Sequence, residues 1–93
     1  MIKSFRSDEA QKVYEREGSR KLPNDIQNVA LRKLWMINAA VTIADLRIPP
    51  ANRLEKLSGK RGGQYSIRIN DKWRICFRWN QGDAYEVEIT DYH

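Results

Sequence analysis

The feature that most constrains this chain is a two-residue alternation of apolar and polar side chains in its last third. The apolar positions are Tyr65, Ile67, Ile69, Trp73, Ile75, Phe77, Trp79, Tyr85, Val87 and Ile89. A period of two with one apolar face is typical of an antiparallel sheet that is covered on one side only. We therefore expect a three-stranded meander over residues 65–89.

The residues before this meander carry the pattern of helices. Asp8 with Gln11 resembles a capping box, which would open a helix that Gly18 ends. A longer helix is expected to start at residues 23–25 and to present apolar residues at spacings of three and four. Those residues are Ile26, Val29, Ala30, Leu34, Ile37 and Val41, with Leu31 and Trp35 widening the apolar face.

This order of elements predicts an α+β fold, in which two N-terminal helices pack on an antiparallel sheet of three to four strands. Residues 2–5 form a short apolar segment that can supply the extra strand. Thr42 and Asp45 are expected to cap one more short turn before Pro49-Pro50 stops helix formation. The 93 residues are expected to form a single domain, residues 1–93, with a thin core.

The sequence also argues against several classes of protein. It has no apolar stretch long enough for a signal peptide or a membrane span, so we expect a cytoplasmic protein. The single cysteine, Cys76, excludes an internal disulfide and is expected to be packed in a strand rather than reactive. No His, Cys and carboxylate cluster has the spacing of a metal site, and none of the spacings matches a nucleophilic triad or a P-loop.

A pair of arginines is expected on the polar side of the sheet. Pairing has to keep every apolar residue on one side, and a three-residue turn at 70–72 then sets Arg68 directly opposite Arg74. Directly opposed like charges destabilise a sheet, so a phosphate bound between them is one explanation; two side chains extended into solvent are the other. The same face is expected to carry an ion pair between Arg78 and Glu86.

The end of the chain is expected to lie beside this arginine pair. A five-residue loop at 80–84 would pair Trp79 with Tyr85 and leave Thr90 next to Arg74. The last three residues, Asp91, Tyr92 and His93, would then emerge at the same place. Imidazole titrates near neutral pH and a phenol can stack on a base or donate a proton, although a chain end is often frayed.

Charge is distributed unevenly along the chain. Residues 46–80 contain nine basic and two acidic residues, a net charge of +7, within a chain whose total is +5. Residues 81–93 contain four acidic and no basic residues. A segment this basic indicates a polyanionic partner, most simply a nucleic acid, unless it is only a well-solvated surface.

Five segments, spread over the whole chain, share the pattern of one protein family: Met1–Phe5, Arg53–Gly59, Gln64–Asn70, Trp73–Phe77 and the terminal Asp91-Tyr92-His93. This pattern resembles the host-inhibition-of-growth (HigB) toxins, also called proteic killer proteins, of the RelE/ParE superfamily of type II toxin–antitoxin systems. The resemblance implies a compact fold with a concave sheet. It also implies a ribosome-dependent mRNA endoribonuclease that uses a 2′-hydroxyl attack and requires no metal or other cofactor.

The resemblance implies a site at the arginine pair. The expected catalytic residues are Arg68, Arg74, Asp91, Tyr92 and His93. The expected contacts to RNA or the ribosome are Arg53, Lys56, Lys60, Arg61, Lys72 and Arg78. Glu55 and Ser58 stand where some relatives have a His and a Lys, so the general base and the general acid stay unassigned.

The implied partners are a helix-turn-helix antitoxin and a ribosome with mRNA in its A site, with no membrane and no small-molecule substrate. Two other functions remain open at this point. A toxin of the same fold can act on another target, such as gyrase, because a fold does not determine a target. A plain RNA-binding module without catalysis would also account for the basic segment.

Overall fold

A computed structural model describes residues 1–91 of the chain. The helices are α1 (Asp8–Tyr14) and α2 (Asn24–Ala39), and the strands are β1 (Glu55–Lys56), β2 (Gln64–Arg68), β3 (Arg74–Asn80) and β4 (Asp83–Thr90). Three short 3₁₀ turns lie between α2 and β2: η1 (Ile43–Arg47), η2 (Pro50–Asn52) and η3 (Gly59–Arg61). The predicted positions of Tyr92 and His93 fall outside the described residues.

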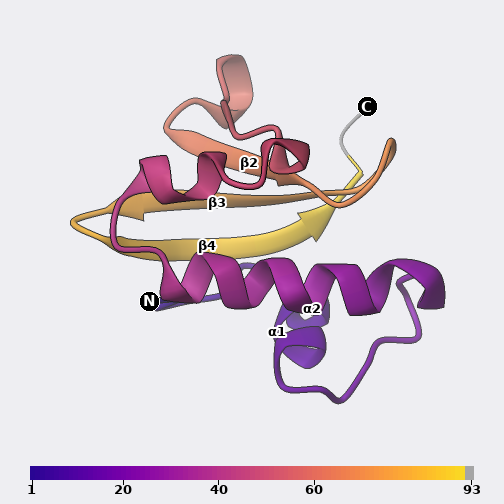
Figure 1. The fold of residues 1–93 in the computed structure, drawn as a ribbon. Helices are drawn as coiled ribbons and strands as arrows, with labels where there is room; N and C mark the ends of the chain where they lie inside the picture. Colours follow the sequence, from indigo (N-terminus) through magenta and orange to yellow (C-terminus); the bar gives the residue numbers. More distant parts are fainter. Residues whose placement is uncertain (92–93) are drawn as a thin grey trace.

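The four strands form one antiparallel sheet in the order β1-β2-β3-β4, and both helices lie on the same side of it (Figure 1). The predicted α+β fold is confirmed. The core lies between α2 and the sheet, where Leu34 and Ile37 of the helix are buried together with Ile67, Ile75 and Phe77 of the strands. We call the other side of the sheet the polar face; it carries Ser66, Arg68, Arg74, Cys76 and Arg78.

The first helix is shorter than expected. Its N-cap is Ser7, whose Oγ accepts a hydrogen bond from the Ala10 N–H at 3.3 Å, so the capping box at Asp8 was wrong by one residue. The helix ends at Tyr14, because Arg16 already adopts a left-handed backbone with φ of +63°. Gly18 therefore lies in the connection between the helices rather than at the end of α1.

The second helix begins and ends close to its predicted limits, but its buried face differs. Val41, predicted as part of the apolar face, is 75% exposed, and Trp35, predicted to widen that face, is 44% exposed, so both predictions are wrong. Val41 follows the end of α2, where the helical period no longer applies, and Trp35 lies outside the buried stripe. Lys33 is buried instead, at helical spacing from Ala30 and Ile37.

The connection after α2 contains the predicted short turn. Thr42 and Asp45 form a complete capping box at the start of η1. Pro49-Pro50 does not stop helical structure altogether, since Pro50 opens the 3₁₀ turn η2. Proline is tolerated there because the first residue of a helical turn needs no N–H partner.

The pairing of β2 with β3 is the predicted one. Tyr65 lies opposite Phe77, Ile67 lies opposite Ile75, and the apolar side chains all face the helices. The turn at 70–72 has the expected three residues, with the Ile69 N–H donating to the Trp73 carbonyl oxygen at 2.9 Å.

The pairing of β3 with β4 differs from the prediction. The hairpin turn has two residues, Gln81 and Gly82, with φ of +50° and +83°, so the expected five-residue loop is wrong. Trp79 therefore lies opposite Ala84 rather than Tyr85. A β-bulge at Glu86, whose φ is +51°, restores the predicted register by Ile89.

The segment at 2–5 extends the sheet at the outer edge of β4. Ile2 and Phe5 form parallel bridges with Ala84 and Val87. The short apolar start is therefore extended, but the fourth strand of the sheet is β1 rather than this segment. Within residues 1–91, no helix is long and apolar enough to cross a membrane.

Candidate RNA-cleavage site on the polar face

The two arginines of the β2–β3 hairpin lie directly opposite each other, as predicted. The turn between them is held by Asn70, whose Oδ1 accepts hydrogen bonds from the N–H groups of Lys72 and Trp73 at 2.9 and 2.7 Å. Asn side chains stabilise tight turns in this way because they replace a backbone acceptor. These two hydrogen bonds within the turn therefore help to place Arg68 opposite Arg74.

Arg74 is held by three groups on neighbouring segments. Its Nε donates to Ser66 Oγ and its Nη2 donates to the Arg53 carbonyl oxygen, both at 2.9 Å. The same Nη2 lies 3.5 Å from Oε2 of Glu55. The Arg74 side chain is 16% exposed, so the guanidinium has a defined direction and still reaches the surface.

Arg68 has a partner of its own, because it forms an ion pair with Asp71 in the adjoining turn. Neither arginine of the opposed pair therefore depends on a bound phosphate or on solvent alone to offset its charge. Asp71 offsets one guanidinium and Glu55 offsets the other. Neither carboxylate lies in β2 or β3, which is why pairing of the two strands did not reveal it.

The end of β4 reaches this place, as expected. Thr90 lies opposite Arg74. The next residue, Asp91, has its Oδ2 3.5 Å from Nζ of Lys72. Both arginines, Lys72 and Asp91 thus gather at one end of the sheet.

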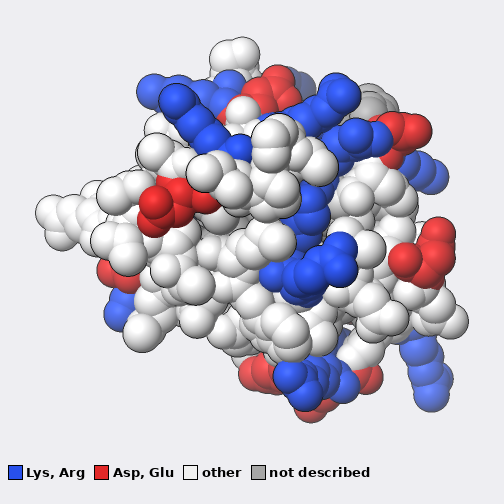
Figure 2. All heavy atoms as spheres, in the orientation of Figure 1, with Lys and Arg blue, Asp and Glu red and all other residues white. Residues whose placement is uncertain are grey.

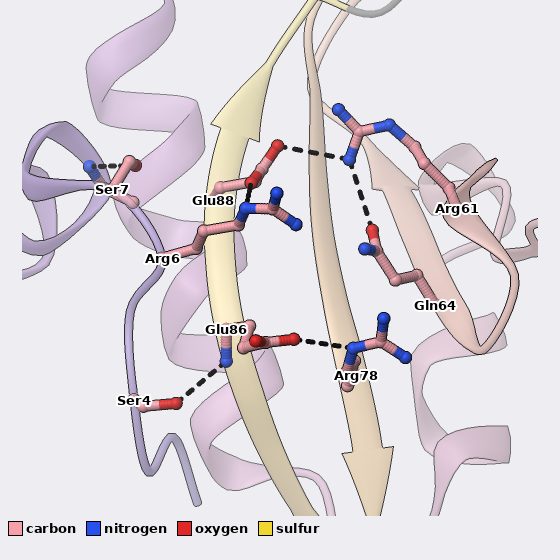
Figure 3. A network of polar contacts seen from close by, with 9 residues as sticks. Ser4, Arg6, Ser7, Arg61, Gln64, Arg78, Glu86 and Glu88 are labelled. Carbon is pink, nitrogen blue, oxygen red and sulfur yellow. Dashed lines mark hydrogen bonds and ion pairs between the residues drawn. The ribbon is translucent and has the colours of Figure 1, made fainter.

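Arg61 crosses the polar face from the β2 side to β4 (Figure 3). Its Nη1 donates to Oε1 of Gln64 and to Oε1 of Glu88, each at 3.2 Å. The other oxygen of Glu88 lies 3.2 Å from Nε of Arg6, in the segment that precedes α1. One carboxylate of β4 therefore binds two arginines from distant parts of the chain.

A basic wall made by β1 and η3 stands beside Arg74. It contains a shallow pocket of about 340 Å³, lined by Glu55, Lys56, Leu57, Ser58, Lys60 and Arg61. Lys56 and Lys60 are exposed, and neither forms an ion pair with any residue of the described part of the chain. Ammonium groups of this kind are available to phosphates. Arg53, also exposed, lies just before this wall.

Arg78 lies farther along β3, where the predicted ion pair with Glu86 is present at 2.6 Å between Nε and Oε2. A Cβ on Gly63, whose φ is +85°, would lie 2.7 Å from Nη1 of Arg78, so the guanidinium occupies space that only glycine leaves. The residue opposite Arg78 is Tyr85. Tyr85 therefore lies on the polar face rather than in the core. The sequence Gln81-Gly82 suits a two-residue hairpin turn, and recognising this turn would have predicted the position of Tyr85.

Cys76 lies in the middle of the polar face but is fully buried, as predicted for a packed cysteine. Burial raises the pKa of its thiol to about 11, so the thiol is protonated at neutral pH. Among residues 1–91, no three His, Cys, Asp or Glu side chains form a group that could hold a metal ion.

Basic side chains dominate the upper half of the face shown in Figure 2. Lys and Arg form a nearly continuous band from the upper edge to the middle of this view, with isolated Asp and Glu side chains between them. In Figure 1 the upper edge is where β2 and the turns before it lie. The upper part of this band therefore lies over β2 and the turns that precede it.

Comparison with known proteins assigns the chain to a family. The sequence profile of RelE-like toxins of the type II toxin–antitoxin system HigB matches residues 3–93. This chain belongs to the HigB-like toxin family. The family assignment agrees with the resemblance found in the sequence, including its extent over nearly the whole chain.

Two relatives with HigB names match the chain over nearly its whole length. Toxin HigB-1 of Vibrio cholerae serotype O1 is 40% identical over 93 residues, which cover 99% of this chain and 98% of that toxin. Endoribonuclease HigB of Proteus vulgaris is 34% identical over 94 residues, which cover 100% of each chain.

Solved structures of two other toxins share the fold. A YafQ variant from E. coli has a TM-score of 0.65 at 10% identity, covering 98% of this chain and 91% of that one. The heterotetrameric YoeB–YefM toxin–antitoxin complex from Staphylococcus aureus contains a chain with a TM-score of 0.62 at 18% identity, covering 100% and 98%. At these identities the likeness establishes the RelE-like fold alone.

Proposed function

We propose that this chain is a ribosome-dependent endoribonuclease that cuts mRNA in the ribosomal A site and so arrests translation and growth. The observation that carries the proposal is the guanidinium of Arg74, held by Ser66 and the Arg53 carbonyl oxygen beside the end of β4. An oriented cation of this kind stabilises negative charge that develops at a phosphate. The relative from Proteus vulgaris is named an endoribonuclease, which supports the same reaction here.

The proposed reaction is attack of a ribose 2′-oxygen on the adjacent phosphorus, with departure of the 5′-oxygen of the next nucleotide. A base accepts the proton of the 2′-hydroxyl and an acid gives a proton to the leaving oxygen, so the step is balanced. The products are a 2′,3′-cyclic phosphate and a 5′-hydroxyl. Arg74, with Arg68 across the hairpin, stabilises the added charge of the pentavalent phosphorus, and the scheme uses no metal or cofactor.

Asp91, Tyr92 and His93 supply the proton-transfer groups in this proposal. An imidazole serves as base or acid near neutral pH, and a phenol donates a proton or stacks on a base. Glu55 acts as the counter-ion of Arg74, because its Oε2 lies 3.5 Å from Nη2 and its side chain is 57% exposed. A substrate phosphate would replace one anion beside Arg74 by another.

The RNA strand and the ribosomal RNA would contact the basic residues around the site: Arg53, Lys56, Lys60, Arg61, Lys72 and Arg78. The exposed ammonium groups of Lys56 and Lys60 lie on the wall next to Arg74. Binding that depends on such phosphate contacts weakens steeply as the salt concentration rises.

A helix-turn-helix antitoxin is the expected protein partner, since the family belongs to type II toxin–antitoxin systems. The solved YoeB–YefM complex is an example of a toxin of this fold with its antitoxin. We expect the antitoxin to cover the basic face or to block its access to the ribosome. Because the proposed substrate is mRNA on ribosomes, the toxin would act in the cytoplasm.

The test is expression of the chain alone in bacteria, with mapping of 5′ ends on a reporter mRNA. One reporter is translated and a matched one lacks its ribosome-binding site. We expect growth arrest and new 5′-hydroxyl ends in the translated reporter only. Arg74→Ala should abolish both effects, whereas Lys12→Ala, an exposed residue of α1, should leave them intact.

Other outcomes point to other functions. Growth arrest with intact transcripts would contradict the proposal, and a supercoiling assay with purified protein would then test gyrase as the target. Salt-sensitive RNA binding without growth arrest would indicate a non-catalytic binding module.

A further inference from the structure

Lys33 is a charged residue buried in the core. It lies on the inner face of α2 and is 6% exposed. Its Nζ donates a 2.6 Å hydrogen bond to Oδ1 of Asn52, and no carboxylate of residues 1–91 forms an ion pair with it. Burial lowers the pKa of Lys33, and the nearby charges of Arg32 and Arg68 lower it further.

A buried ammonium without an opposite charge destabilises a fold, because the group gives up its hydration and gains only hydrogen bonds. An apolar residue of similar length would fill the same space without that loss. Filling the core therefore does not explain why a lysine stands at position 33 and bonds to Asn52.

Asn52 fixes the connection between α2 and β1. It is fully buried, and its Nδ2 donates to the carbonyl oxygens of Leu46 at 3.2 Å and Ile48 at 3.5 Å. Its N–H donates to the Pro49 carbonyl oxygen at 2.9 Å. Together with the bond from Lys33, these contacts bind η1 and η2 to each other and to α2.

The residue after Asn52 is part of the site. Arg53 has a φ of +45°, a left-handed conformation that is unfavourable for a residue with a Cβ unless its surroundings hold it. Its carbonyl oxygen accepts the 2.9 Å hydrogen bond from Nη2 of Arg74, and Glu55 lies 3.5 Å from the same nitrogen. Two of the three groups that hold Arg74 therefore lie just after Asn52 in the chain: the carbonyl oxygen of Arg53, the next residue, and the carboxylate of Glu55, three residues on.

We propose that Lys33 and Asn52 are positioning residues for Arg74. The buried hydrogen bond between them places the Arg53 carbonyl oxygen and so sets the direction of the guanidinium at the phosphate. Neither residue touches the RNA. The catalytic consequence rests on the proposed function, whereas the orientation of Arg74 is measurable without any substrate.

The test variant is Lys33→Met, which keeps the length of the side chain and removes the donor to Asn52. Its matched control is Val13→Ala, which removes buried methyl groups from α1 and leaves residues 46–55 unchanged. The readout is the ¹⁵N resonance of the Arg74 Nε–H, identified by its loss in Arg74→Lys. In the wild type this proton should exchange slowly, because it is bonded to Ser66.

We expect the Arg74 resonance to shift and its exchange to accelerate at least tenfold in Lys33→Met, with both unchanged in Val13→Ala. On ribosomes carrying mRNA, kcat of Lys33→Met should fall about tenfold or more while KM stays within about twofold. A misdirected guanidinium weakens stabilisation of the transition state more than it weakens binding of the substrate.

A folded Lys33→Met variant with an unchanged Arg74 resonance would overturn the proposal, and so would an equal change in Val13→Ala. Where Lys33→Met does not fold, the double variant Lys33→Met/Asn52→Leu takes its place, since it removes both partners of the hydrogen bond and leaves neither polar group buried without a partner. Its Arg74 resonance must change in the same way. A wild-type protein that does not cut RNA would contradict the proposed function. The Arg74 resonance would still decide whether Lys33 and Asn52 orient the guanidinium, because it is measured without RNA.

Discussion

Nη1 of Arg61 lies 3.2 Å from Oε1 of Glu88, although the two residues are 27 positions apart in the chain. The second oxygen of Glu88 lies 3.2 Å from Nε of Arg6. A single carboxylate thus holds two arginines on the face that we propose binds RNA (Figure 3). The same carboxylate repels any phosphate that approaches them.

Replacing Glu88 by glutamine should therefore strengthen RNA binding. Glu88→Gln keeps the shape of the side chain and removes one negative charge between two guanidinium groups. We expect the Kd for a single-stranded RNA at low salt to fall about fivefold, the effect of roughly 1 kcal/mol from one partly solvated charge. Fluorescence anisotropy at several salt concentrations measures this. Asp25→Asn, in the first turn of α2, makes the same change in net charge away from the polar face and should have little effect.

A lysine cannot replace Arg74. Arg74→Lys keeps the positive charge but cannot donate at once to Ser66 and to the Arg53 carbonyl oxygen. We expect cleavage of translated mRNA to fall by about a hundredfold or more while the protein stays folded, as circular dichroism would show. Arg47→Lys, an exposed residue of η1, is the control and should cleave normally. Equal activity of wild type and Arg74→Lys would show that only charge matters at this position.

Removal of Tyr92 and His93 should abolish toxicity without unfolding the protein. The last strand of the sheet ends at Thr90, and the buried core residues of the described chain extend only as far as Ile89. Growth curves report the loss of toxicity, and circular dichroism reports the fold. Full toxicity of the shortened chain would contradict the assignment of proton transfer to this end of the chain.

Gly63 and Gly59 form a matched pair for testing the place of Arg78. Both have positive φ, but a Cβ on Gly63 would lie 2.7 Å from Nη1 of Arg78, whereas a Cβ on Gly59 would have nothing within 4 Å. Gly59→Ala should cost about 1 kcal/mol of unfolding free energy from backbone strain. Gly63→Ala should cost about 0.5 kcal/mol more, because the flexible end of Arg78 has to move aside and gives up its exposed ion pair with Glu86. Urea denaturation measures both, and equal losses would contradict the close contact.

Asp45 should make the stability of the protein depend on pH in the acid range. Hydrogen bonds from the N–H groups of Thr42 and Val41 lower the pKa of Asp45 below its ordinary value of 3.8. A carboxyl whose pKa is lower in the folded state stabilises the fold above its ordinary pKa, and this contribution disappears as the pH falls through the lowered value. Asp45→Asn should be less stable than wild type at pH 7, with a difference that vanishes in acid. Thermal melts between pH 7 and pH 2 would show it, and a constant difference would contradict it.

Only some of the surroundings of Arg74 could be predicted from the sequence. Its place opposite Arg68 follows from the alternation and the short turn at 70–72, both of which are local. Its partners Glu55 and the Arg53 carbonyl oxygen come from a connection whose course depends on the buried Asn52. Lys33 lies at helical spacing from the buried Ala30 and Ile37, and this spacing indicated that it would be buried too. Lysine is rarely buried in proteins, however, so its residue type predicted an exposed side chain.

The class of fold, the β2–β3 register and the side of the sheet that carries the arginines all follow from the amino-acid sequence. These follow because side chains alternate with a period of two and an apolar face must be buried. The bulge in β4, by contrast, depends on a tertiary contact. The bulge at Glu86 leaves an N–H without a partner in the sheet, and Ser4 Oγ accepts it at 2.9 Å from the other end of the chain. The two-residue turn has already set Tyr85 on the polar face, and the bulge held by this distant contact returns Val87 and Ile89 to the core side. No local pattern in β4 contains that contact.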